Sequence, residues 1–186
     1  MEAAKIWLTA IIATIAYGIA HDLVTTRVSL EYFTIAHAGI FQTQSPTLLA
    51  FGWGIVATWW GGVLLGGLIA LTARFGKRPK VALRDLARPG AVLLLAIGVL
   101  SLIAGITAYI AAGAGAISLS AGLAADIPPG GAHQRLLAVA WAHTAAYGAG
   151  FVGASLFAAW VWIGRARAAS ATADGLPPSS LRAEVV

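Results

Sequence analysis

The sequence predicts an all-α protein, an integral membrane four-helix bundle. Of its 186 residues, 59% are hydrophobic and only 10% are charged, whereas about a quarter of the residues in a soluble domain are charged. The second observation is four long apolar stretches that contain no Lys, Arg, Asp or Glu. The chain also has no Cys. These features exclude a soluble globular domain, a disordered chain and a disulfide-stabilised scaffold.

Each apolar stretch predicts one membrane-spanning helix, because about 20 apolar residues cross the hydrocarbon core. The predicted spans are residues 6–20, 47–73, 91–112 and 136–164. The first lies between Lys5 and the pair His21-Asp22. It is short, its composition also fits a cleavable signal peptide, and we expect it to be retained as an anchor whose helix continues beyond the apolar run.

The remaining boundaries follow from capping residues and composition. Ser45 and Pro46 precede the second span as an N-cap and a first-turn proline. Pro89 and Gly90 come just before the third span and indicate where it begins. We expect residues 1–167 to form a single transmembrane domain. Residues 168–186 are polar and contain prolines, which predicts a disordered cytoplasmic tail.

Basic residues predict the orientation. The connection between the second and third spans, residues 74–89, holds six Lys or Arg and one Asp, while the other two connections hold one Arg each. Lys and Arg accumulate in cytoplasmic loops, so both termini are expected in the cytoplasm and the protein in a bacterial plasma (inner) membrane. This role explains the basic loop, and no nucleic-acid partner is predicted.

Small residues recur at helical spacing in two spans. Gly62 and Gly66 form a G-x-x-x-G pair, and Ala or Gly recurs every fourth residue from Ala142 to Ala158. Such faces let two helices approach closely in lipid. Packing within one bundle is the favoured interpretation. A homo-oligomer, or attachment to a larger membrane complex, is the alternative partnership besides the lipid bilayer.

Ionisable residues gather in the predicted outer half. All four His and three of the seven acids lie there. His21 and His143 fall at similar depths on two different spans, each with a tyrosine one turn deeper, Tyr17 and Tyr147. Ionisable groups inside a membrane are costly and usually face one another.

This distribution predicts an outward-facing His/carboxylate cluster that binds a metal. The candidate ligands are His21, Asp22, Glu31, His37, His133 and His143. Imidazoles with carboxylates suit a divalent transition metal, Zn, Cu, Fe or Mn, and no thiolate is present to bias the choice. A membrane metalloenzyme or a redox protein would follow, with Tyr17, Asp22 and Tyr147 as candidate catalytic residues for proton handling.

Three other interpretations remain open. The cluster can be a structural polar network in which Arg27 pairs with Glu31. It can be a haem site with His21 and His143 as axial ligands. The protein can also be an accessory subunit or a small transporter, although the inner halves of the spans carry no charges.

Overall fold

The computed structural model describes residues 1–37 and 39–173, and within them every regular element is a helix. In chain order these are α1 (Glu2–Val28), α2 (Leu30–Thr34), α3 (Pro46–Val56), α4 (Trp59–Arg74), α5 (Leu83–Gly113), α6 (Ala121–Ala125) and α7 (Gly131–Ala173). Four segments are long and apolar enough to cross a membrane: Glu2–Val28, Pro46–Arg74, Leu83–Gly113 and Gly131–Ala173. Each contains one predicted span. The all-helical class and four membrane-length segments are therefore confirmed.

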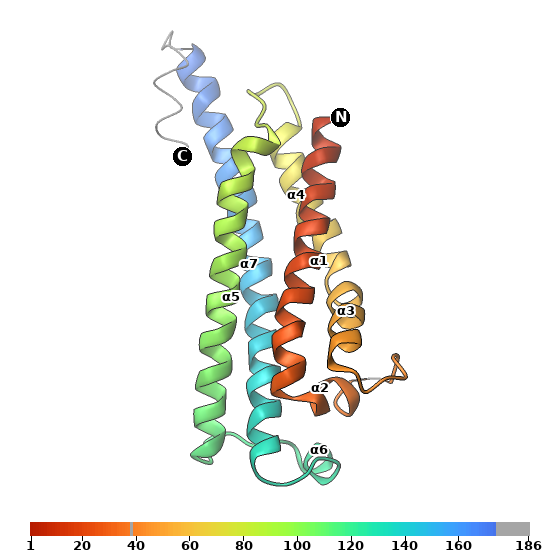
Figure 1. The fold of residues 1–186 in the computed structure, drawn as a ribbon. Coiled ribbons are helices and arrows are strands. Elements are labelled where there is room, and N and C mark those ends of the chain that lie inside the picture. The colour runs from red at the N-terminus through yellow and green to blue at the C-terminus, as the bar shows by residue number, and fades with distance from the viewer. Residues whose placement is uncertain (38, 174–186) are drawn as a thin grey trace.

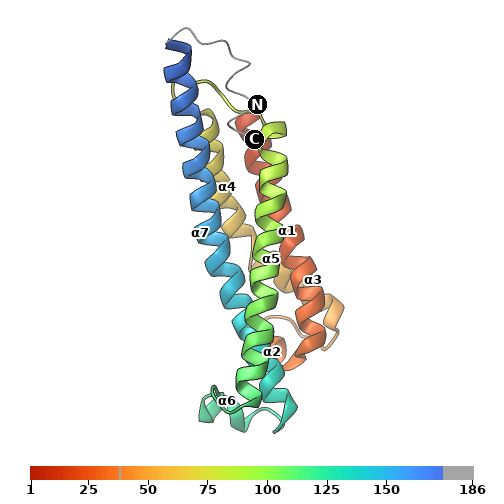
Figure 2. The same cartoon turned by 90° about the vertical axis from the view of Figure 1, so that its left-hand side faces the viewer.

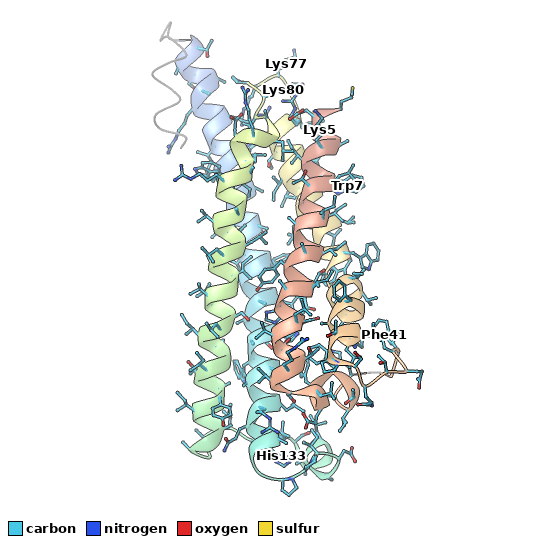
Figure 3. All side chains as sticks on the ribbon, in the orientation of Figure 1. Lys5, Trp7, Phe41, Lys77, Lys80 and His133 are labelled. Atoms are coloured by element: carbon cyan, nitrogen blue, oxygen red, sulfur yellow. The ribbon has the colours of Figure 1, made fainter. Side chains whose placement is uncertain are left out.

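The long helices lie side by side, with the N-terminus and the end of α7 at one end and α2 and α6 at the other (Figure 1). Lys5, Lys77 and Lys80 lie at the first end and His133 at the opposite one (Figure 3). Turned by 90°, the molecule is narrow, and α7 reaches beyond its neighbours at the first end (Figure 2). The basic loop thus shares an end with the N-terminus.

The helices are longer than the apolar runs that predicted them. α1 continues through His21-Asp22 because polar side chains beyond that point are satisfied within the helix. Thr25 Oγ1 donates to the carbonyl of His21 at 3.2 Å, and Thr26 Oγ1 donates to that of Asp22 at 2.6 Å. At the other end of the chain, α7 includes residues 168–173 of the predicted tail. The rest of that tail, residues 174–186, lies outside the described residues.

α5 begins at Leu83, before Pro89, which was expected to precede the helix. Asp85 accepts a hydrogen bond from the backbone N–H of Ala82 at 3.2 Å, which caps the first turn. Leu86 is buried against Ile6 and Val161. This packing holds the turn in place and lets Pro89 lie inside the helix.

The second predicted span is interrupted at Ala57 and Thr58, between α3 and α4. Thr58 Oγ1 donates to the carbonyl of Gly54 at 2.5 Å, a local bond that competes with the helical ladder. At the same level the backbones of α1 and α3 nearly touch. A Cβ on Gly54 would lie 2.6 Å from the backbone of Ile19. The interruption therefore marks the closest crossing of these two helices.

The predicted small-residue faces pack within the chain. A Cβ added to Gly62 would lie 2.8 Å from Ile11 Cα, and one added to Gly66 would lie 2.6 Å from Ala10 Cβ. On α7, Ala142 lies against Gly105 of α5. These glycines and alanines let the helices of one molecule approach closely.

Arg165 locks the end of α7 to the basic loop. Its side chain is 2% exposed and donates to four backbone carbonyls. The acceptors are those of Thr72, Phe75, Arg78 and Pro79. One guanidinium thus satisfies two carbonyls at the end of α4 and two in the loop that follows.

Candidate metal centre

The last third of α1 and the first third of α7 bring together His21, Asp22 and His143. Each offers one ligand atom, and the three atoms lie within 4.8 Å of one another. Asp22 and His143 are buried, and His21 is half-buried. Three of the six predicted ligands therefore form one compact group that could hold a metal ion, in the half of the molecule opposite the N-terminus.

Burial distinguishes this group from the outward-facing cluster that the sequence predicts. The short helix α2 turns back beneath the long helices at the end of α1 (Figure 1). Its Tyr32 and Phe33 rings pack on His143, with centroids 4.8 and 5.7 Å from the imidazole centroid. Phe33 is only 3% exposed and also packs against Trp53 and Val139. α2 thus covers the group from that end.

Two contacts of the His143 ring indicate which of its nitrogens carries a hydrogen. Nδ1 lies 2.8 Å from the carbonyl oxygen of Val139, one turn earlier on α7. A carbonyl only accepts, so Nδ1 carries a hydrogen, and in the neutral form of the ring Nε2 has a lone pair. Nε2 in turn lies 3.1 Å from Asp22 Oδ1. A lone pair and a carboxylate oxygen at this distance repel unless a proton or a cation lies between them.

His21 supplies the third candidate ligand atom of the group. Its Nε2 is buried and has no hydrogen-bond partner among the described residues. The ring meets that of His143 edge to face, with centroids 4.6 Å apart. Unpartnered buried polar atoms are rare, because desolvation without a hydrogen bond is costly. A metal ion held by Nε2 of His21 would give this nitrogen a partner.

Tyr17 and Tyr147 are the two tyrosines that the sequence analysis singled out near the group. The Tyr17 ring stacks on His21 with a centroid separation of 5.8 Å, and its hydroxyl is also buried without a partner among the described residues. Tyr147 lines the same cavity as the three ligands. The Tyr17 hydroxyl is therefore unpaired among the described residues, and both tyrosines border the cavity.

The other three predicted ligands are engaged elsewhere. Glu31 accepts from Ser29 Oγ at 2.9 Å. His37 Nδ1 lies 2.8 Å from the carbonyl of Tyr32, and its ring packs on Trp53. His133 Nε2 lies 3.1 Å from the carbonyl of Ile127. Each is held in the α2 or α6 region by local backbone geometry, which prediction from membrane depth did not include.

The predicted pair of Arg27 with Glu31 is also replaced by other contacts. Arg27 donates to the carbonyl of Leu23 at 2.5 Å and to Thr47 Oγ1 at 3.0 Å. Ser29 ends α1 and turns the chain into α2, so the four-residue helical spacing assumed for the pair is broken. The structural network that the sequence suggested therefore lacks this link.

Tyr32 and Val139 are site residues that sequence reasoning missed. Val139 has a clear signal, since it lies four residues before His143 on the same helix. Tyr32 has none, because its position depends on the turn at Ser29. Burial raises the pKa of Tyr32 to about 12, so it covers His143 as a neutral phenol.

The group lies at one end of a cavity of about 720 Å³ between α1, α4, α5 and α7. His21, Asp22, His143, Tyr17 and Tyr147 line one end of it, and the wall continues along α1 to Ile6. A metal held by three protein ligands keeps a coordination position for another molecule, and this cavity is where such a molecule would lie.

Comparisons of the chain with known protein families, with curated proteins and with solved structures returned no match.

Proposed function

We propose that this chain is an integral membrane protein whose four long helices form a bundle and whose His21, Asp22 and His143 bind one divalent transition metal. The basic loop at the end shared with the N-terminus supports a cytoplasmic location for both termini, in a bacterial plasma membrane.

One observation carries the metal proposal. The Nδ1–H of His143 is committed to Val139, so its Nε2 lone pair and Asp22 Oδ1 face each other at 3.1 Å. His21 is beside them, and its Nε2 has no hydrogen-bond partner among the described residues. Three donors converging in a buried place are the arrangement that a cation stabilises.

The donor set indicates the class of metal. Two imidazoles and one carboxylate suit Zn, Fe, Cu or Mn, and they suit Mg or Ca poorly. The Val139 carbonyl accepts from Nδ1 of His143 and orients the ring, as backbone carbonyls do for many metal-bound imidazoles. When bound, such an ion supplies Lewis acidity toward a molecule in the cavity. Tyr17 and Tyr147 would then donate or accept hydrogen bonds at that molecule.

Two other interpretations of the group compete with this one. A proton shared by Asp22 and His143 gives a structural network, and the 3.1 Å distance also suits a hydrogen bond. A haem would need its macrocycle between the two imidazoles, and the 4.6 Å edge-to-face contact of these rings favours a single shared ion.

The test is elemental analysis together with an optical spectrum of protein purified in detergent without chelator. We expect about one equivalent of a transition metal and no Soret band. Three variants should each bind this metal at least tenfold more weakly than wild type: His21→Ala, Asp22→Asn and His143→Ala. His37→Ala and His133→Ala are matched controls, since they remove histidines near the same end but outside the group.

Each contrary outcome has a definite meaning. Full metal occupancy in all three ligand variants would overturn the site. A Soret band that disappears in His143→Ala would establish haem in its place. If the wild-type protein contains no metal and takes up none of the added ions Zn²⁺, Fe²⁺, Cu²⁺ or Mn²⁺, the structural polar network becomes the remaining interpretation of the group.

A further inference from the structure

The cavity beside the metal group is long and polar at only one end. Along α1 it extends from Ile6 to Asp22, which is roughly 24 Å at 1.5 Å per residue. With a volume of about 720 Å³, its mean cross-section is on the order of 30 Å². A space this long can accommodate one extended chain.

The wall is apolar away from the metal group. The part of the cavity farther from the metal group is lined by apolar residues such as Ile69, Leu86, Leu93 and Phe157. Three threonines also contribute, Thr9, Thr14 and Thr58, and the hydroxyls of two of them are already used. Thr14 donates to the carbonyl of Ala10 at 2.8 Å and Thr58 to that of Gly54. Those two hydroxyls are therefore satisfied without a ligand, and the ionisable groups lie at the far end of the cavity.

The cavity is open along the flank of the molecule. Several lining side chains are also exposed on the flank of the molecule, namely Trp60 and Leu64 on α4 and Phe151 on α7. These positions are in the middle of membrane-length helices. A molecule that enters here comes from the hydrocarbon of the bilayer.

Charge selects the head group. A divalent ion held by two neutral imidazoles and one carboxylate leaves one positive charge uncompensated in apolar surroundings, which is costly. An anionic oxygen ligand in the open coordination position would neutralise it. A compact carboxylate or phosphate on a hydrocarbon chain meets both requirements, the anion at the metal and the apolar wall behind it.

We infer that the cavity binds a single-chain anionic amphiphile, a fatty acid or a monoalkyl phosphate, taken laterally from the bilayer. Its head group lies at His21, Asp22 and His143, beside Tyr17 and Tyr147. Its chain follows α1 toward Ile6. This inference rests on the proposed metal site for the head group and on the cavity for the chain.

Binding of radiolabelled palmitate to the metal-loaded protein in phosphatidylcholine nanodiscs tests the inference, with empty nanodiscs as background. We expect one saturable palmitate per chain. Hexadecanol, which has the same chain and a neutral head, should compete at least tenfold more weakly. Metal-depleted protein and His143→Ala should also bind palmitate at least tenfold more weakly.

Two cavity-filling variants separate the chain from the head group. A Cβ on Gly61 or Gly90 meets nothing within 4 Å, and both positions line the cavity away from the ligands. Gly61→Phe and Gly90→Phe should therefore fold, keep the metal and lose palmitate binding at least tenfold. Leu102→Phe is the matched control, because Leu102 is 61% exposed and lies outside the cavity. The metal content of each variant reports its folding.

The outcomes distinguish the two proposals. Bound metal without saturable palmitate overturns this inference and leaves the metal site intact. Saturable palmitate that is lost in Gly61→Phe, in a protein that takes up no metal, overturns the metal site and the head-group assignment. Equal binding of palmitate and hexadecanol by metal-loaded protein overturns the charge argument.

Discussion

Asp22 Oδ1 lies 3.1 Å from Nε2 of His143, although 121 residues separate the two along the chain. The hydrogen on Nδ1 of His143 is directed at Val139, so this contact joins two groups that each have a lone pair to offer. Whatever lies between them, a metal ion or a proton, determines the chemistry of the site.

Asp22→Asn distinguishes these two occupants. The asparagine amide can donate to Nε2 of His143, so we expect the fold to persist with a melting temperature within a few degrees of wild type. The metal should be lost, because an amide is a far weaker ligand than a carboxylate. Metal content and thermal unfolding are measured on the same preparation. Unchanged metal content would remove Asp22 from the ligand set.

Gly54→Ala should destabilise the protein, because its Cβ would lie 2.6 Å from the Ile19 backbone. Backbone atoms cannot move aside as a side chain can, and overpacking of this kind costs about 1–3 kcal/mol. Gly61→Ala on α4 is the control, since nothing lies within 4 Å of its Cβ. There alanine should stabilise the helix by up to about 1 kcal/mol. Thermal unfolding in detergent compares the two, and equal midpoints would contradict the close crossing of α1 and α3.

Arg165→Lys should destabilise the end of the molecule that holds the basic loop. An ammonium offers three hydrogens from one point and cannot reach the four carbonyls that the guanidinium satisfies. We expect a loss of about 3 kcal/mol or more in the free energy of unfolding, from carbonyls left without a donor. Arg167→Lys, two residues further along the same helix, should stay within about 0.5 kcal/mol of wild type. A loss confined to Arg167→Lys would refute the locking role.

Tyr32 should titrate unusually late. Burial raises its pKa from 10.0 to about 12, so the neutral form is favoured in the folded protein. Its contribution to the stability of the α2 cover is complete below pH 10 and is lost as the pH rises through 12. The difference in tyrosinate absorbance between wild type and Tyr32→Phe isolates this group. A midpoint near pH 10 would show that the ring is open to solvent.

Local patterns in the sequence predicted the elements of this protein. Hydropathy predicted four membrane-length helices. A long apolar segment forms a helix in lipid because its backbone N–H and C=O groups must hydrogen-bond within the segment. The same reasoning placed His21, Asp22 and His143 at similar depths. It did not predict the interruption at Ala57 and Thr58, which lies where α1 and α3 approach closely.

Tertiary structure decided which candidate ligands meet. Depth along a helix follows from residue number, but the direction in which a side chain points depends on how α1 and α7 rotate against their neighbours. Close packing at Gly54 and Gly62 sets that rotation for α1. The turn at Ser29 then places Tyr32 over His143 and holds Glu31 and His37 apart from the group. These are contacts between distant segments, and no local pattern of residues encodes them.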